Sequence, residues 1–217
     1  MRRTAKAGPD SRARILAAAQ AEFAARGFDG ANMDRVARAA RLNKAMIYYH
    51  FRSKAALYAE IFQAFIRAAL DRAREVADSP ADPAAKIRAF IRAVAEEAAT
   101  RPHFPAMWLR EVAGGGRHVD RATLELIGEL PATLGRIVAE GRAQGRFRAI
   151  HPLLLHFGIV GPLVLFFVSR PVRQRITVPA VRAVPLAMED AIAEIERATL
   201  AALAPDAPAG RPQGRPS

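Results

Sequence analysis

The stretch Lys44–Leu57, with the sequence KAMIYYHFRSKAAL, decides the fold of this chain. Ile47 and Phe51 recur at helical spacing, so we expect a short helix from residue 44 to 51 that turns both side chains into a core. Ser53 then supplies an N-cap hydroxyl for the free N–H groups of the next helix. The stretch therefore predicts a short helix followed at once by the start of a long one, which we expect to reach about residue 77.

Two more helices are predicted before this stretch. The first begins near Asp10 or Ser11 and ends at Gly27, because glycine adopts the left-handed conformation of a helix end at little cost. The second, 33–40, is capped by Asn32 and is joined to the third by a turn of about three residues. Three small helices with such a turn predict a helix-turn-helix, whose last helix enters the DNA major groove. The geometry alone also allows a subdomain core without DNA.

The distribution of charge favours the nucleic-acid interpretation. Residues 1–54 carry +8 of the net charge of +12, so two thirds of the excess lies in the first quarter of the chain. A basic end of this kind suits a polyanion. The alternative is a general richness in arginine. The chain contains no cysteine, which excludes disulfides, thiolate metal sites and cysteine nucleophiles.

Helical signals continue through the rest of the chain, and no segment shows convincing strand alternation. The first residues, 1–11, are predicted to be a flexible basic arm without a secretory signal, which favours a cytoplasmic location. The tail 205–217 has no large apolar side chain and is predicted to be disordered. Pro131 and Pro185 are expected to kink or divide their helices. The further helices are expected at 84–99, 105–113, 118–144, 152–169 and 178–204.

About twenty spaced residues between Arg12 and Phe62 resemble the DNA-binding domain of the TetR family of bacterial regulators. The matching residues are Ile15, Leu16, Ala17, Ala18, Ala19, Phe23, Arg26, Gly27, Phe28, Met33, Val36, Ala37, Ala40, Leu42, Lys44, Ile47, Tyr48, Phe51, Ser53, Lys54, Ala56 and Leu57. The resemblance implies an all-α protein with a helix-turn-helix domain at 12–54 and a helical domain at 55–204 that binds an effector and dimerises. It further implies a homodimeric regulator, usually a repressor, that a small molecule releases from a palindromic operator.

The sequence departs from the family pattern at three places. Arg41 stands where the family usually has a glycine, and a left-handed conformation there costs an arginine about 1 kcal/mol. Arg52 stands where proline is frequent, and the order Tyr49-His50 reverses a common pair. The preference for particular bases therefore does not carry over from relatives.

The DNA-facing residues are predicted from the second and third helices. By resemblance, Tyr48 and Lys54 hold phosphates, while Asn32 offers phosphate a helix N-terminus. Tyr48 and His50 have an alternative as packed side chains. The full candidate set is Asn32, Arg41, Lys44, Ala45, Met46, Tyr48, Tyr49, His50, Arg52 and Lys54.

The segment 152–169 is apolar nearly all round, so both of its faces need burial. We expect it to form a dimer interface together with the last helix. A membrane span is the rival interpretation, because eighteen residues approach the required length. His156, Gly158, Gly161 and Pro162 interrupt the segment, and no aromatic belt frames it. The sequence therefore favours a homodimer and no membrane.

Aromatic-rich segments of the larger part predict a pocket for a hydrophobic or aromatic effector. Arg110 could pair with an acidic effector, and Glu111 and His118 could add polar contacts. The candidate ligand-binding residues are Phe90, Phe104, Met107, Trp108, Arg110, His156 and Phe157.

Enzymatic function is not expected. The histidines are scattered without metal-ligand spacing, and no Gly-x-Ser-x-Gly elbow is present. The run 114–116 lacks the Gly-Lys-Ser/Thr of a phosphate loop. We expect no cofactor and no metal. A non-specific architectural DNA binder is the other class that the basic N-terminus allows, but it leaves the long apolar helices unexplained.

Overall fold

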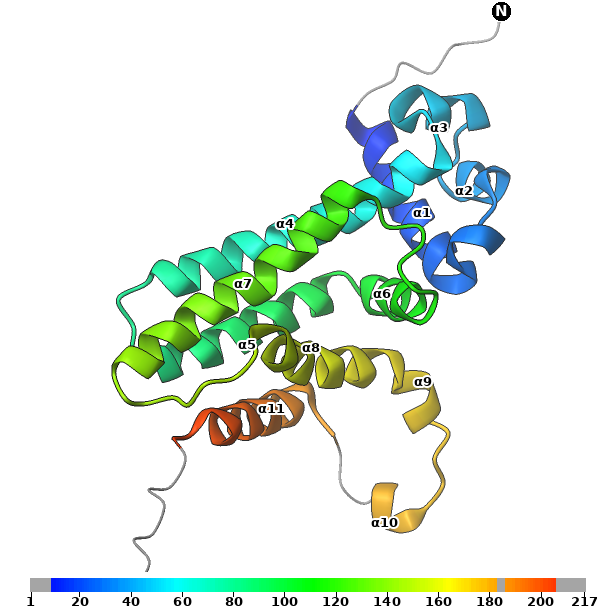
Figure 1. Ribbon diagram of the computed structural model, residues 1–217. Helices are drawn as coiled ribbons and strands as arrows, with labels where there is room; N and C mark the ends of the chain where they lie inside the picture. Colours follow the sequence, from blue (N-terminus) through cyan, green and yellow to red (C-terminus); the bar gives the residue numbers. More distant parts are fainter. Residues whose placement is uncertain (1–8, 183–185, 206–217) are drawn as a thin grey trace, which may run out of the picture.

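The computed structural model describes residues 9–182 and 186–205, and every regular element in these ranges is a helix (Figure 1). The predicted all-α fold is confirmed. The helices are α1 (Pro9–Gly30), α2 (Met33–Ala39), α3 (Lys44–Phe51), α4 (Lys54–Asp78), α5 (Pro83–Thr100), α6 (Phe104–Ala113), α7 (Arg121–Ala143), α8 (Pro152–Val168), α9 (Arg170–Arg173), α10 (Pro179–Arg182) and α11 (Met188–Leu203).

Helices α1–α3 form a compact unit at the N-terminal end of α4 (Figure 1). Their centre is made by Ile15, Phe23, Val36 and Ile47, each fully buried. Burial of these apolar side chains is the main force that holds such short helices together, because helices of seven or eight residues are marginal alone. The helical spacing read from the sequence therefore identified the inward faces correctly.

Side-chain caps set where the short helices begin. The Asn32 side chain accepts a hydrogen bond from the Asp34 N–H at 2.7 Å, and Ser53 accepts one from the Ala56 N–H at 3.0 Å. Asn43, in the predicted turn, caps α3 in the same way. Each cap satisfies a backbone donor that has no partner within its helix. The predicted bounds of α2 and α3 are correct to within one residue.

The chain bends at Gly27, which has φ 69° and ψ −179°. Only glycine adopts this backbone conformation without strain. The predicted break at Gly27 is thus confirmed, but helical structure resumes and reaches Gly30, where a loop was expected from residue 28. At the other end, α1 already includes residues 9–11, which were assigned to the flexible arm; residues 1–8 lie outside the described part.

Arg41 has φ 53°, the left-handed conformation that its position predicted. The guanidinium of Arg14, on α1, donates to the carbonyl oxygens of Ala40 at 2.5 Å and of Arg41 at 3.1 Å. These bonds satisfy the two carbonyls that the tight turn leaves without helical partners. Arg52 also has a positive φ, 60°, which a proline ring could not adopt.

The larger part of the chain is built around α4, α5 and α7, which run side by side (Figure 1). Helix α8 packs against α5, α6 and α7, and α11 packs beside α8 and α5. Helix α7 continues through Pro131, so the division expected there does not occur. The predicted helix 178–204 is instead two helices, α10 and α11, separated around Pro185, which lies outside the described residues.

Replacing Arg41 with glycine should raise the free energy of unfolding by about 0.5–1 kcal/mol, because glycine carries no penalty for a positive φ. The matched control is Arg38→Gly, which removes an exposed arginine from the regular part of α2 and should lower stability by about 1 kcal/mol. Urea unfolding of both variants measures the difference. Equal destabilisation by the two changes would contradict a strained turn at Arg41.

Candidate DNA-binding helix and effector cavity

Helix α3 turns one apolar face inward and presents the other to solvent. Ile47 and Phe51 are buried, whereas Tyr48 and Tyr49 are 41% and 72% exposed. Lys44 and Ala45 are also exposed, as is Arg52 at the end of the helix. Tyr48 is therefore not a packed core tyrosine. The exposed face carries aromatic, aliphatic and cationic groups, which are side chains of the kinds that contact base edges and phosphates.

Asn32, at the start of α2, and Lys44, at the start of α3, are both exposed. The Lys44 ammonium forms an ion pair with Asp34 at 3.0 Å, and this hydrogen bond raises the pKa of Lys44. The lysine is therefore fully charged at neutral pH. Since the pair is exposed, a phosphate can compete with Asp34 for the ammonium at little cost.

Lys54 joins α4 to the end of α1. Its ammonium donates to the carbonyl oxygens of Ala31 at 2.8 Å and Asp29 at 3.4 Å, and lies 4.7 Å from the centre of the Phe28 ring. Two of its three donors are thus taken by the protein, and one is left for a phosphate. The sequence assigned Lys54 to DNA and did not reveal this structural role.

Met46 and His50 are half-buried members of the predicted DNA-facing set. The His50 ring meets the Tyr49 ring edge-on at 5.3 Å, and its Nε2 atom is buried without a hydrogen-bond partner among the described residues. His50 is therefore partly packed, as one of its two interpretations allowed, and its ring contacts the ring of Tyr49.

A narrow cavity of about 50 Å³ lies among α4, α5, α6, α7 and α8. The Phe65 and Phe104 rings stack at 3.5 Å beside it, and Trp108 adds a third aromatic side chain. Its lining residues are Phe65, Ile66, Ala69, Val94, Ala98, Phe104, Pro105, Trp108, Ile127, Leu130, His156, Val160, Leu163 and Val164. The wall is apolar except for the imidazole of His156 and the indole N–H of Trp108.

The structure brings Phe104, Trp108 and His156 together at this cavity, out of the seven residues proposed for it. Phe90 and Met107 are buried in the core but do not line the cavity. Phe157 is 54% exposed and points away from it, one residue along α8 from His156. Successive helical residues lie about 100° apart, so neighbours on α8 face different surroundings.

Arg110 does not reach the cavity. Its guanidinium donates to the carbonyl oxygens of Ala24 and Ala25 on α1, at 3.2 and 3.3 Å. These carbonyls lie just before the bend at Gly27, where helical partners are lost. Arg110 therefore joins α6 to α1 and is no partner for an acidic effector.

Glu111 and His118 also face the helix-turn-helix unit. The buried Glu111 carboxylate accepts hydrogen bonds from the Tyr58 hydroxyl at 2.8 Å and from the His118 backbone N–H at 2.9 Å. Burial, with the bond to Glu111, raises the pKa of Tyr58. The His118 ring then lies 3.3 Å from Asp29 at the end of α1. The sequence suggested that Glu111 and His118 contact a ligand. It did not reveal their partners Tyr58 and Asp29, which lie far away along the chain.

His156 is the polar group of the cavity wall. It is 4% exposed, and its Nδ1 atom is buried without a hydrogen-bond partner among the described residues. Burial lowers the pKa of His156 to about 4, because the charged imidazolium loses its solvation. The imidazole is therefore neutral at pH 7, with one nitrogen as donor and the other as acceptor.

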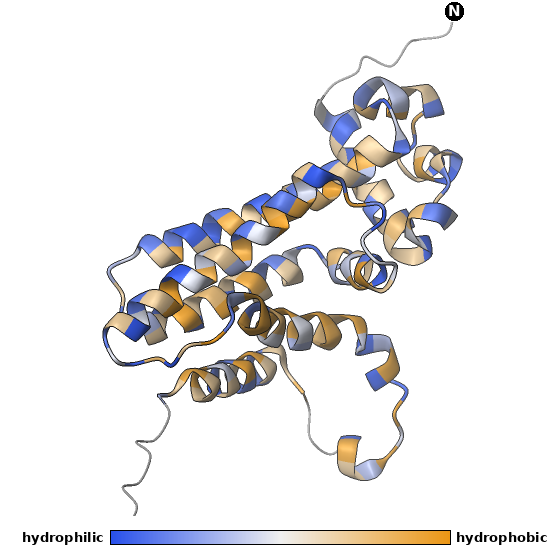
Figure 2. Ribbon diagram, in the orientation of Figure 1, coloured by the Kyte–Doolittle hydropathy of each residue, from blue (hydrophilic) through white to orange (hydrophobic). Residues whose placement is uncertain are grey.

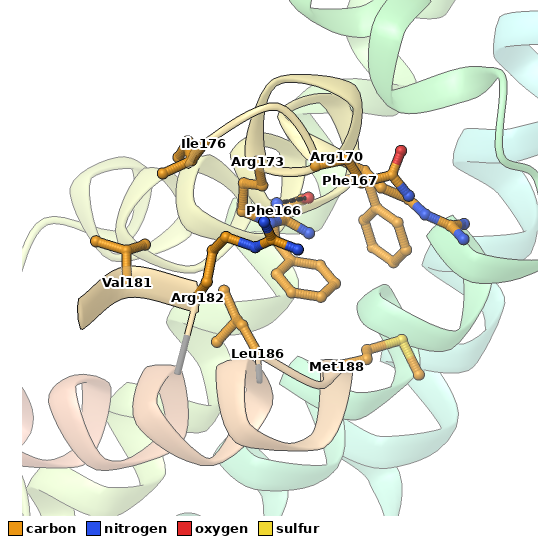
Figure 3. A pocket seen from close by; sticks show the side chains of 10 residues that line it. Phe166, Phe167, Arg170, Arg173, Ile176, Val181, Arg182, Leu186 and Met188 are labelled. Carbon is orange, nitrogen blue, oxygen red and sulfur yellow. Dashed lines mark hydrogen bonds between the residues drawn. The ribbon is translucent and has the colours of Figure 1, made fainter. Parts of the chain in front are cut away.

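A second, wider hollow of about 740 Å³ lies where α9 and α10 pass the start of α11 (Figure 3). None of its lining side chains is buried. The Arg173 guanidinium lies over the Phe166 ring at 4.5 Å and donates to the Phe166 carbonyl. The lining residues are Phe166, Phe167, Arg170, Arg173, Gln174, Ile176, Val181, Arg182, Leu186 and Met188. This is a surface depression, in contrast to the enclosed cavity.

Helix α8 leaves an apolar stripe uncovered. Leu154, Phe157 and Leu165 are each more than half exposed, and Gly158 lies exposed between them. Figure 2 shows the hydrophobic colour along most of α8, whereas α4 and α7 show alternating colours. The opposite face of α8 contacts the cavity. The sequence predicted that both faces of α8 need burial, but one of them is exposed to solvent in the single chain.

Comparison with known proteins agrees with this architecture. The model of the bacterial regulatory proteins of the tetR family matches residues 15–61, and the tetracyclin repressor-like C-terminal domain matches residues 83–200. The chain belongs to the TetR family. It is 28% identical to the HTH-type transcriptional repressor NicS of Pseudomonas putida over 187 residues, 85% of this chain and 86% of that protein. It is a DNA-binding regulator of this family, whose members act on DNA as dimers that respond to ligands.

One further relative and two solved structures are also similar to this chain. The HTH-type transcriptional repressor SCO4008 of Streptomyces coelicolor is 42% identical over 73 residues, 34% of this TetR-family chain and 35% of that protein. The crystal structure of the regulator PfmR from Thermus thermophilus has a TM-score of 0.67 at 23% identity, with 87% of this chain and 97% of that chain covered. The ketosteroid regulator KstR2 of Mycobacterium tuberculosis has a TM-score of 0.69 at 20% identity, with 94% and 100% covered. These structures share the fold.

Within residues 9–182 and 186–205, no helix is both long and apolar enough to cross a membrane. In the same ranges, no three His, Asp or Glu side chains gather where they could hold a metal ion.

Because of His156, the free energy of unfolding should fall by up to about 1.4 kcal/mol per pH unit as the pH falls from 6.5 towards 4. The lowered pKa gives this sign, because the unfolded chain binds a proton at His156 below pH 6.5 and the folded chain does so only near pH 4. Above pH 6.5 this contribution is fully present. Urea unfolding of the wild type and of His156→Leu at several pH values measures it.

The leucine variant is its own control for the carboxylates. Glu22 and Asp120 have lowered pKa values and also reduce stability in acid, but they are unchanged in the variant. The difference between the two proteins therefore reports His156. If the free energy of unfolding changes with pH equally in the wild type and in His156→Leu, the imidazole is not buried in its neutral form.

Proposed function

We propose that this chain is a ligand-responsive repressor that binds a palindromic operator as a homodimer and leaves it when a small apolar molecule enters the cavity. The observation that carries the proposal is the arrangement of α4 and α6. Both helices line the enclosed cavity and both contact the helix-turn-helix unit. A DNA-binding regulator of a bacterial family would act in the cytoplasm, where the DNA lies.

DNA reading is assigned to the exposed face of α3. Tyr49, the most exposed aromatic side chain of this face, would lie nearest the base edges together with Ala45 and Met46. Tyr48 and Lys44 would flank them, and Arg52 and Asn32 would hold phosphates on either side. Contacts to phosphate position the protein, and only two or three side chains read bases. One helix of eight residues offers too few base contacts for a specific site, so two copies are needed.

The second copy is proposed to cover the exposed stripe of α8. Leu154, Phe157 and Leu165 would be buried against the partner, and the glycines Gly158 and Gly161 would let two helices approach closely. Helix α11 lies beside α8 and would complete a four-helix interface. An isologous contact of this kind closes as a two-fold dimer, which matches a palindromic operator.

Release follows from the shared helices. Phe104 and Trp108 line the cavity from α6, while Arg110 holds α1 from the other end of the same helix. A ring-sized molecule is larger than the cavity of about 50 Å³, so its entry would displace α4 and α6. This displacement would carry the two reading units out of the spacing of about 34–36 Å that matches successive major grooves. Such a ligand must bind the DNA-incompetent state more tightly, or it shifts nothing.

Selection from a random pool of double-stranded DNA should return one palindromic consensus. Tyr49→Ala should then weaken binding to that sequence by roughly tenfold, as expected for a base contact. Arg52→Ala should weaken binding to all sequences and reduce the dependence of log K on log salt by about 1. Fluorescence anisotropy at several salt concentrations measures both effects.

The matched control is Leu124→Ala, which shortens an exposed side chain on α7 and should leave DNA binding unchanged. A pool that returns no consensus would favour a non-specific architectural binder and would contradict the proposed function.

Phe157→Glu should convert the dimer to monomers at micromolar concentrations, because the change places two charges in a closely packed apolar interface. Sedimentation equilibrium measures the mass. Leu124→Glu is the control, since it introduces the same charge at a similarly exposed leucine on α7 and should leave the dimer intact. An unchanged dimer in Phe157→Glu would place the interface elsewhere.

A further inference from the structure

Apart from the indole N–H of Trp108, the imidazole of His156 is the one polar group among the fourteen side chains of the cavity wall. His156 is 4% exposed, and its buried Nδ1 atom makes no hydrogen bond to the described residues. A buried polar atom without a partner destabilises a protein, because it has lost its hydration and gained no hydrogen bond in exchange. Neighbouring positions on α8 are filled by aliphatic residues, so an apolar side chain would fit the wall without this cost.

We infer that His156 is the polar anchor for the effector, and that the effector is an uncharged, largely apolar molecule with one hydrogen-bonding group such as a phenol or a ketone. The inference rests on the proposed function, because it names the class of ligand for the cavity described above. Apolar walls supply affinity, and a single placed polar group orients the ligand. The aromatic side chains Phe65, Phe104 and Trp108 favour a ring.

The absence of a countercharge on the cavity wall argues against an acid. Arg110 donates to carbonyls of α1 and faces away. The Arg101 guanidinium lies 5.8 Å from the centre of the Phe65 ring, but it forms an ion pair with Glu97. No lysine or arginine is among the lining residues. A carboxylate in this cavity would be desolvated without compensation.

An amine is disfavoured for the same reason, since no carboxylate lines the wall. Glu111 is the nearest acidic residue of α6, and both of its oxygens are occupied by Tyr58 and His118. The neutral imidazole offers one donor and one acceptor, so it can serve a hydroxyl or a carbonyl but compensates neither charge.

Three probes of nearly equal shape test the inference: p-cresol, toluene and p-toluate. Titration calorimetry on the full chain gives the affinities, and the fluorescence of Trp108, the sole tryptophan, reports binding at the cavity. We expect p-cresol to bind about five- to tenfold more tightly than toluene, as one buried hydrogen bond provides. We expect p-toluate at neutral pH not to bind where p-cresol saturates.

The variants separate anchoring from shape. His156→Leu keeps the approximate volume and removes the polar atom, so the preference for p-cresol over toluene should disappear while toluene still binds. His156→Asn keeps a hydrogen-bonding group and should retain a preference for p-cresol. Circular dichroism verifies that both variants remain helical.

Three results would overturn the inference. They are tighter binding of p-toluate than of p-cresol, an unchanged preference in His156→Leu, and no binding of any probe at millimolar concentration. Operator binding is measured separately on the same preparation. A protein that binds one DNA sequence but none of the probes refutes the ligand class alone, whereas a protein without a preferred DNA sequence refutes the proposed function.

Discussion

The apolar face of α4 is the constraint on which the rest of the structure depends. Its first turns, with Leu57, Tyr58 and Phe62, are buried near α1, and its later turns, with Phe65 and Leu70, are buried among α5 and α7. One continuous core therefore runs through both parts of the chain. Because a close-packed interior transmits displacement rather than absorbing it, a change beside Phe65 is felt at the start of the same helix. Packing therefore gives a continuous path of buried side chains from the cavity to the helix-turn-helix unit.

Polar contacts provide a second connection, which runs through α6. The bend at Gly27 leaves carbonyl groups of α1 without helical partners, and the Arg110 guanidinium donates hydrogen bonds to two of them. Glu111, next to it, can remain buried because Tyr58 and the His118 backbone donate to it. Removing one member of such a group leaves the others buried without partners, which costs more than the net contribution of the bonds. Helix α6 is therefore held to the helix-turn-helix unit by directional bonds, which makes its position dependent on that of α1.

The sequence predicted the helix-turn-helix unit well because its determinants are local. Asn32 and Ser53 are caps that act within three residues, and Ile47 and Phe51 show their inward face by spacing alone. The cavity is different, since five helices contribute to it. Helix α8 is apolar on all sides, so its sequence carries no sign that His156 faces inward and Phe157 outward. The role of Arg110 was equally hidden, because its partners lie more than eighty residues earlier in the chain and exist only after α1 has bent.

Arg41 and His156 are both exceptions to local rules, and the difference between them is informative. Arg41 occupies a left-handed position that favours glycine, but the surrounding structure compensates it: the Arg14 guanidinium satisfies both carbonyls of the turn. His156 breaks the rule that buried polar groups are paired, and the described residues offer its Nδ1 atom no compensation. A compensated exception needs no explanation beyond the fold. An uncompensated one, placed on the wall of the enclosed cavity, is explained by a partner that the chain itself does not provide.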